Sequence, residues 1–374
     1  MDENALWVAA LDQPPLWIAA TKYGHDQAEK MRQLVLGGAD IHEKAGRWET
    51  TALHQAVRFG TKEAVLTLLE IGADVDSKDV NGKASIHMAT SEFRGYRGFE
   101  VNDFITRDSD SNMSEKVFHW IKFGADITAM DKGGRTVLHS VTKDLEFIVG
   151  APPDDEEHIE VLQTFLLLLE NTPNPSSQDG KGNTPLHYAT GWGETAFMQP
   201  LIERGLDVNA KNILGMTPLH MAASHIEGEA FVCPGTAWEG HCEAALLLLK
   251  NFADILATDN NGDMALHIAA EHGHSEMVRV LLEKGADLLA TNNDGKTPLQ
   301  LSINIMGQRE TWIDDTGIFG FPPGHAKVAA MLQAAETRRA ACTALAVGHH
   351  ARLGAGSLLM QLPPEVMHLI QDLI

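Results

Sequence analysis

Apolar residues recur at helical spacing in many segments of the chain, as in residues 65–69 (VLTLL) and 277–282 (MVRVLL). This spacing predicts helices that bury one stripe. Glycine adopts the left-handed C-cap conformation without strain, so we expect these helices to end near the glycines that follow them, which are Gly72, Gly124, Gly205 and Gly285. Phe252 occupies the equivalent position in another segment, and there we expect a distorted helix end.

A second, shorter helix is predicted before each of these. Thr184-Pro185 and Thr217-Pro218 open it, because the hydroxyl caps a helix and proline fits the first helical position. Turn sequences such as residues 79–82 (DVNG) and 259–262 (DNNG) predict tight hairpins between successive helix pairs. Each unit is therefore predicted to contain a hairpin, an inner helix and an outer helix.

The inner-helix motif T-P-L-H-x-A, or a close variant, returns at an interval of 33 residues or of 33 plus an insertion. Its histidines are His54, His87, His139, His187, His220 and His267, and Gln300 takes the same place last. A single helix pair cannot bury its own apolar face, so the units must stack on one another.

Residues 183–189 (NTPLHYA), 216–223 (MTPLHMAA) and 264–289 (MALHIAAEHGHSEMVRVLLEKGADLL) closely resemble the ankyrin repeat family, and the resemblance extends from about Pro14 to Ala335. It implies an all-α ankyrin-repeat solenoid of about eight helix-pair units with hairpin connections. It also implies a non-enzymatic protein-protein interaction module, a scaffold or recognition protein. We expect the solenoid to span residues 1–335 and a capping helix with a tail to span 336–374.

Four insertions interrupt the period, each between the inner and outer helix of its unit: 93–113, 142–157, 224–240 and 307–324. They contain ten of the 23 aromatic residues of the chain, with 16 acidic and 5 basic residues. Aromatic residues dominate interface hot spots, and acids around them attract a basic partner. The predicted partner-binding residues are Tyr96, Phe99, Phe104, Phe231, Trp238, Trp312, Phe319 and Phe321. Alternatively, these rings pack beneath their own loops as small clusters.

The whole chain has 29 basic and 51 acidic residues, a formal charge of −22. This charge argues against nucleic acid as a ligand. No segment is long and apolar enough to span a membrane, and three cysteines are too few for a disulfide framework. The first residues lack the basic region of a signal peptide. We therefore expect a monomer in the cytoplasm, with the nucleus or the cytosol of a host cell as alternatives.

Catalytic and metal chemistry are not expected. The repeat histidines should lie roughly 10 Å apart, too far to share a metal, and should instead form hydrogen bonds between neighbouring turns. Residues 108–112 begin like a calcium loop, but Met113 replaces the required glycine. Cys233, His241 and Cys242 lack a fourth zinc ligand. We predict no enzyme activity, no metal and no cofactor.

Asn209 lies in LIERGLDVNA, which resembles the site that an asparaginyl hydroxylase modifies in many ankyrin proteins. The resemblance makes Asn209 a candidate hydroxylation site. Alternatively, it is a hairpin residue that bonds its own backbone.

The tail contains an alanine-rich segment, 327–345, which we expect to form a capping helix. Residues 362–374 (LPPEVMHLIQDLI) resemble the opening helix of an F-box, and the resemblance assigns ligase recruitment to Leu362, Pro363, Glu365 and Ile370. It implies an alternative function, the substrate adaptor of a cullin-type ubiquitin ligase. Otherwise this segment is an amphipathic helix that docks on the final repeat.

Overall fold

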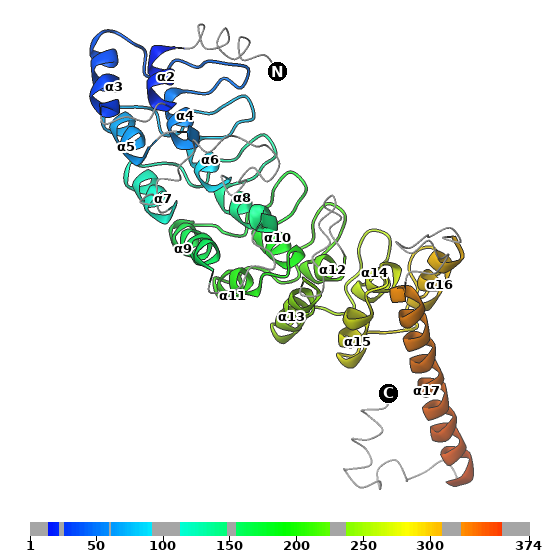
Figure 1. Ribbon diagram of the computed structural model, residues 1–374. Coiled ribbons are helices and arrows are strands. Elements are labelled where there is room, and N and C mark those ends of the chain that lie inside the picture. Colours follow the sequence, from blue (N-terminus) through cyan, green and yellow to red (C-terminus); the bar gives the residue numbers. More distant parts are fainter. Residues whose placement is uncertain are drawn as a thin grey trace. The chain divides into compact units, whose positions relative to one another are not determined.

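A computed structural model describes residues 14–21, 26–59, 61–91, 113–147, 155–224, 237–308 and 323–353 (Figure 1). Within these ranges the secondary structure is helical, apart from three isolated β-bridges that close hairpins. The helices form eight consecutive pairs, as the sequence predicted. The chain divides into two compact units, residues 1–213 with 231–240 and residues 214–230 with 241–374.

The first unit contains five helix pairs. Its inner helices are α2 (Pro15–Thr21), α4 (Ala52–Phe59), α6 (Ser85–Ser91), α8 (Val137–Lys143) and α10 (Pro185–Gly191). Its outer helices are α3 (Gln27–Leu36), α5 (Lys62–Glu70), α7 (Met113–Lys122), α9 (Glu156–Asn171) and α11 (Thr195–Glu203). Each inner helix contacts the next inner helix, and α9 contacts both α7 and α11.

The second unit contains three further pairs. Its inner helices are α12 (Pro218–Ala223), α14 (Ala265–Glu271) and α16 (Pro298–Gln308). Its outer helices are α13 (Ala237–Lys250), α15 (Ser275–Glu283) and α17 (Pro323–Leu353), although the first four residues of α13 belong to the first unit. α14 contacts both α12 and α16, and α15 contacts α17.

The sequence explains how these helices begin and what they bury. Thr184 and Thr217 are N-caps in extended conformation, and Pro185 and Pro218 occupy the first helical turn. The predicted stripe of α15 is buried at Met277, Val278, Val280 and Leu281. In the first unit the largest fully buried side chains belong to outer helices: Trp120, Phe165 and Phe197. The apolar core therefore lies between stacked helix pairs, where the repeat pattern predicted it.

All four insertions fall between the two helices of their pair, as predicted. The second of them begins inside the described residues with a 3₁₀ helix, η1 (Asp144–Phe147), in which Leu145 is buried. α17, the outer helix of the last pair, continues without interruption through residue 336, where we expected the segment of the capping helix and tail to begin. The predicted capping helix and the last outer helix are therefore one helix.

The expected distortion at Phe252 was wrong. Phe252 has φ +66°, in the same left-handed region as Gly285 at +90°. The amide of Ala253 donates to the carbonyl of Leu248, as the amide of Ala286 donates to that of Leu281. Phenylalanine thus adopts the glycine conformation and bears its strain, while the helix ends as the others do.

None of the described helices combines the length and the apolar character that crossing a lipid bilayer requires.

Candidate interaction surfaces

The repeat histidines hold the hairpins in place. In each of five helix-pair repeats, the backbone N–H three residues before the histidine donates to Nδ1, at 3.1–3.3 Å. Nδ1 therefore carries no proton. The protonated Nε2 must then donate to a backbone carbonyl of the following repeat, at 3.0–3.2 Å. These histidines are His54, His87, His139, His220 and His267. The predicted role as hydrogen-bonding residues is confirmed, and burial lowers the pKa of His54, His87, His139 and His267, which favours this neutral form.

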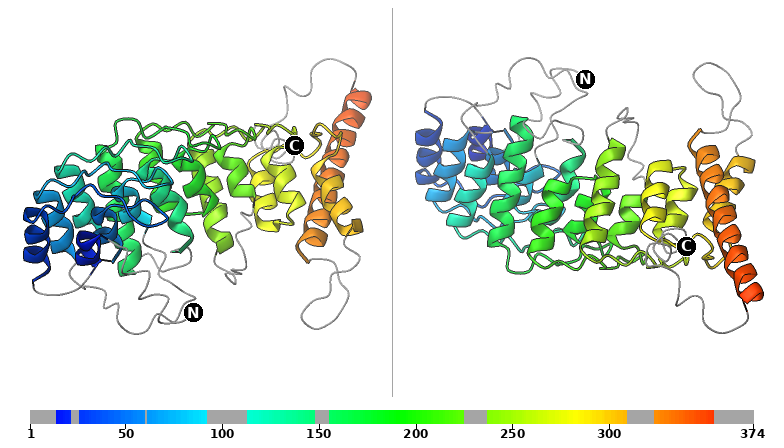
Figure 2. Two further views of the ribbon diagram at one scale, coloured as in Figure 1. Left: turned by 90° about the horizontal axis from the view of Figure 1, so that it is seen from above. Right: turned by 90° about the horizontal axis from the view of Figure 1, so that it is seen from below.

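The hairpins of the first unit lie side by side (Figures 1 and 2). Backbone hydrogen bonds join their tips to one another. The amide of Val80 donates to the carbonyl of Trp48 at 2.9 Å, and the amide of Lys132 to that of Asn81 at 2.9 Å. Two further bonds continue the row, from Gly180 to Gly133 and from Ile213 to Lys181. We call this row, residues 44–50, 78–83, 129–135, 177–183 and 210–213, the hairpin edge of the first unit.

The tips approach so closely that glycine is required at one of them. Gly182 has φ +75°, and a Cβ there would lie 2.7 Å from the backbone nitrogen of Ile213. Both the left-handed conformation and the backbone contact therefore exclude larger residues.

Aspartates in these hairpins point inward. The Oδ1 atoms of Asp79, Asp131 and Asp179 each accept backbone N–H groups two and four residues later, at 2.7–3.0 Å. These side chains are only 7–8% exposed. The phenol of Tyr188 also donates to Asp179 at 2.6 Å, and burial raises the pKa of Tyr188 to about 12. The aspartates thus stabilise the turns and contribute little to the outer surface.

One polar pair in the first unit has no equivalent among the sequence predictions. Glu194 is the N-cap of α11. It has the repeat position that His274 and His325 occupy in the second unit, where each histidine bonds a backbone carbonyl. Burial raises the pKa of Glu194 to about 7. The nearest ionisable partner is His158, whose Nε2 lies 4.0 Å from Oε2 of Glu194 and whose Nδ1 is buried without a hydrogen bond. Comparing this second position between repeats, as we compared the histidines of the inner helix, would have identified Glu194 from the sequence.

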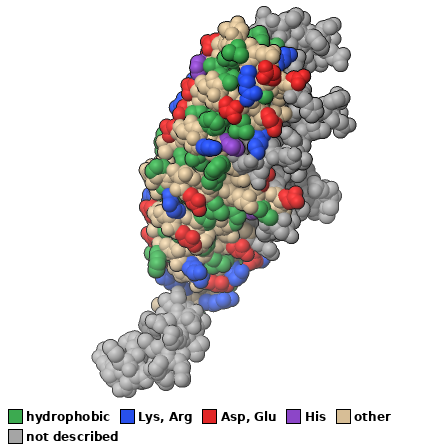
Figure 3. Space-filling view, turned by 90° about the vertical axis from the view of Figure 1, so that its left-hand side faces the viewer, with side chains coloured by type: hydrophobic (Ala, Val, Ile, Leu, Met, Phe, Trp, Pro, Cys, Tyr) green, Lys and Arg blue, Asp and Glu red, His purple; other side chains and the backbone are tan. Residues whose placement is uncertain are grey.

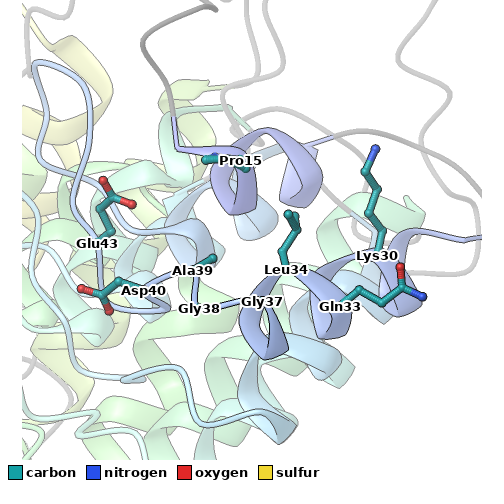
Figure 4. Close-up of a pocket in the computed structure, with 9 residues that line it drawn as sticks. All are labelled: Pro15, Lys30, Gln33, Leu34, Gly37, Gly38, Ala39, Asp40 and Glu43. Carbon is teal, nitrogen blue, oxygen red and sulfur yellow. The ribbon is translucent and has the colours of Figure 1, made fainter.

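A shallow depression in the first unit does not have the features of a ligand site. It lies beside Pro15 of α2 and Leu34 of α3 (Figure 4). Lys30 is at one end and Asp40 and Glu43 are at the other, so no polar groups converge on one point.

Within the described ranges, no three His, Cys, Asp or Glu side chains gather closely enough to hold a metal ion. Cys242 is half-buried in α13, and burial raises the pKa of its thiol. Cys233 and the calcium-like residues 108–112 lie outside the described residues.

Most of the predicted partner-binding residues lie outside the described residues. Trp238 belongs to the first turn of α13, but its side chain is not described. The others are Tyr96, Phe99, Phe104, Phe231, Trp312, Phe319 and Phe321, and the ligase-recruiting residues Leu362, Pro363, Glu365 and Ile370 are also outside. These assignments therefore stay predictions.

Asn209 is described and is partly exposed in the turn after α11, where its amide donates to Oδ1 of Asp207 at 2.8 Å. This contact positions the backbone of the turn. The assignment of Asn209 as a hydroxylation site stays a prediction.

Known proteins share the repeats. The chain is 26% identical to the E3 ubiquitin-protein ligase KEG of Arabidopsis thaliana over 66% of its length, and 25% identical to the transient receptor potential cation channel subfamily A member 1 of Homo sapiens over 63%. It is 28% identical to the palmitoyltransferase AKR1 of Lachancea kluyveri over 50%. The chain spans only 13%, 20% and 21% of these relatives, respectively.

Family profiles match most of the repeat region. Ankyrin repeats in three copies match residues 16–100 and 155–233, a single ankyrin repeat matches 214–260, and ankyrin repeats in many copies match 248–302. These matches cover more than half of the chain and agree with its stacked helix pairs and hairpins. The protein therefore belongs to the ankyrin repeat family.

Proposed function

We propose that this chain is a non-enzymatic scaffold or recognition module and that one of its partners is a protein with a basic surface. Ankyrin repeats are protein-protein interaction modules, and the family is generally non-enzymatic. The names of the three relatives denote a ubiquitin ligase, a cation channel and a palmitoyltransferase. Since these activities differ, the repeats alone do not specify a reaction.

The composition of the insertions carries the proposal of a basic partner. Under a fifth of the chain contains ten of its 23 aromatic residues, and acids outnumber bases there by 16 to 5. Aromatic side chains supply contact area in the centre of an interface, while surrounding carboxylates attract a cationic protein and speed its association. Trp238, Trp312, Phe319 and Phe321 are the proposed anchors.

Replacing these four anchors with alanine should abolish the capture of basic proteins from a lysate, because truncating central aromatic residues removes most of the binding energy. Affinity purification followed by mass spectrometry measures the capture. The control is Phe118→Ala, since Phe118 is 53% exposed on α7 and lies outside the insertions. Unchanged capture by the fourfold variant would contradict the proposal.

Once a basic partner has been identified, reversing the charge of four acidic residues should slow its association with the chain at low ionic strength. These residues are Asp154, Asp155, Glu156 and Glu157. Stopped-flow kinetics measures the rate. An unchanged rate constant would show that these carboxylates do not attract the partner.

The alternative function, a substrate adaptor of a cullin-type ubiquitin ligase, rests on residues 362–374 alone. If these residues recruit the ligase, the full chain should co-purify cullin components and a chain truncated before residue 358 should not. The truncated chain should still capture the partner of the repeats. Absence of cullin components from both purifications would leave the repeats as the sole binding element.

A further inference from the structure

The charge of the hairpin edge of the first unit is opposite to that of the whole chain. Its five segments contain eight basic residues and four acidic ones, whereas the chain has 29 basic and 51 acidic residues. The basic residues are Lys44, Arg47, Lys78, Lys83, Lys132, Arg135, Lys181 and Lys211. The acidic ones are Glu49, Asp79, Asp131 and Asp179.

Burial increases this difference at the surface. The three aspartates are buried within their turns, so Glu49 is the exposed acid of the hairpin edge. Lys44, Arg47, Lys78, Lys132 and Lys181 are all exposed. Arg135 forms an ion pair with Asp131 at 2.7 Å and is thereby neutralised. The exposed side chains of these five segments are therefore mainly basic, while the exposed Asp74, Asp126 and Asp207 lie just before them in the chain.

The cations also follow one another in a fixed order. Lys44 donates to the carbonyl of Lys78 at 2.6 Å, and Lys78 donates to that of Met130 at 3.1 Å. Each ammonium group thus reaches the next hairpin and, bonded to a neutral carbonyl, keeps its charge. Lys132 and Lys181 belong to the row of hydrogen-bonded tips themselves. Successive hairpins therefore present at least one positive group each.

Two other surfaces among the described residues differ from the hairpin edge in charge. The two hairpins of the second unit, residues 257–263 and 290–296, contain Asp259, Asp263 and Asp294 but only one basic residue, Lys296. On the face of the outer helices of the first unit, acidic and basic side chains are interspersed (Figure 3). Of these three surfaces, the hairpin edge of the first unit is the one that carries a row of basic residues.

We propose that the hairpin edge of the first unit binds an extended acidic segment of a second partner protein, with carboxylates at about every third residue. Packed helices lie about 8–10 Å apart, and a segment in the polyproline II conformation advances about 3.1 Å per residue with three residues per turn. Every third side chain of such a segment therefore faces the hairpins, and about three residues span one hairpin step. Five hairpins then accommodate a segment of about 12 residues.

The first hairpin gives this segment a defined end. Trp48 is 44% exposed, and the guanidinium of Arg47 lies 4.5 Å from the centre of its ring. The pair offers an apolar face beside a positive charge, which suits an aromatic residue followed by an acid. This partner differs in charge and in surface from the basic partner proposed above, so either proposal can fail without the other.

A labelled peptide of twelve residues with glutamate at every third position, the rest serine and glycine, provides the probe. Its fluorescence anisotropy should show saturable binding at low salt that weakens as salt is added. A peptide with glutamine in place of glutamate should not bind. A peptide with all glutamates in one block should bind several-fold more weakly, because only one or two hairpins then face its charges.

Lys132→Glu combined with Lys181→Glu should weaken binding of the periodic peptide about tenfold or more, since two attractions become repulsions. The matched control is Lys250→Glu with Lys284→Glu, which reverses two exposed lysines at the C-terminal ends of α13 and α15 and should leave the affinity unchanged. Circular dichroism checks that both variants fold.

Four results would overturn the proposal. Three of them are no binding of the periodic peptide at low salt, equal loss of affinity in the two double variants, and equal binding of the periodic and block peptides. Tighter binding of a twelve-nucleotide single-stranded DNA than of the periodic peptide would also overturn it, because the ligand would then be a nucleic acid.

Discussion

Replacing Leu266 with alanine should lower the free energy of unfolding by about 2–5 kcal/mol. Leu266 lies in α14 with 1% of its surface exposed, and α14 contacts α12, α15, α16 and α17. Alanine would lose the transfer free energy of the missing carbons and leave a cavity between stacked helices. Because stability in a repeat array arises between neighbours, the loss should also loosen α12 and α16.

A urea titration followed by circular dichroism measures the effect, and hydrogen exchange locates it. Leu289→Ala is the control, since Leu289 belongs to the same unit but is 49% exposed, and its effect should stay within about 0.5 kcal/mol. If the two variants unfold at the same urea concentration, the assignment of Leu266 to the contact between repeats is wrong.

The parts of the fold that recur in each repeat could be predicted from the sequence. The threonine caps, the buried stripe of α15 and the role of His54 all follow from local rules that each unit repeats. Because the same residues recur in several repeats, each repeat supports the interpretation of the others. The position of the insertions followed for the same reason, since an extra length between two recurring motifs must fall between the elements that they form.

Features that depend on the direction of a side chain were not predictable in this way. Counting charges along the chain gave −22, and the acidic residues of the insertions indicated a basic partner. Only the structure shows that Asp79 and Asp131 are buried in their turns while Lys44 and Lys132 remain exposed. Likewise, Phe252 keeps the glycine conformation because the contacts around the helix end determine the backbone, whatever the residue prefers.

Replacing Glu194 with glutamine should stabilise the protein by ~2–3 kcal/mol more at pH 8 than at pH 5. Burial raises the pKa of Glu194 from 4.5 to about 7, so the folded state retains a proton that the unfolded state releases. Stability is then lost as the pH rises from 4.5 towards 7. Glutamine has the same shape and no charge, and the variant does not lose that stability.

Urea titrations of the wild-type protein and the Glu194→Gln variant at pH 5 and pH 8 measure this difference. The comparison separates the contribution of Glu194 to stability from that of the histidines. Burial lowers the pKa of His54, His87, His139 and His267, so their contribution is lost as the pH falls through about 6.5. This opposite trend is common to both proteins and cancels. Glu170→Gln, at an exposed position of α9, should show no such difference.

Destabilisation by Glu194→Gln at pH 8 would indicate an ion pair, because His158 lies 4.0 Å from Glu194. If the imidazole took up a proton, the two side chains would form an ion pair, and glutamine would destabilise the protein at pH 8. Burial lowers the pKa of His158, and a separation of 4.0 Å is too long for a hydrogen bond. Both facts favour a neutral imidazole, so a protonated carboxyl is the form that burial stabilises at this position.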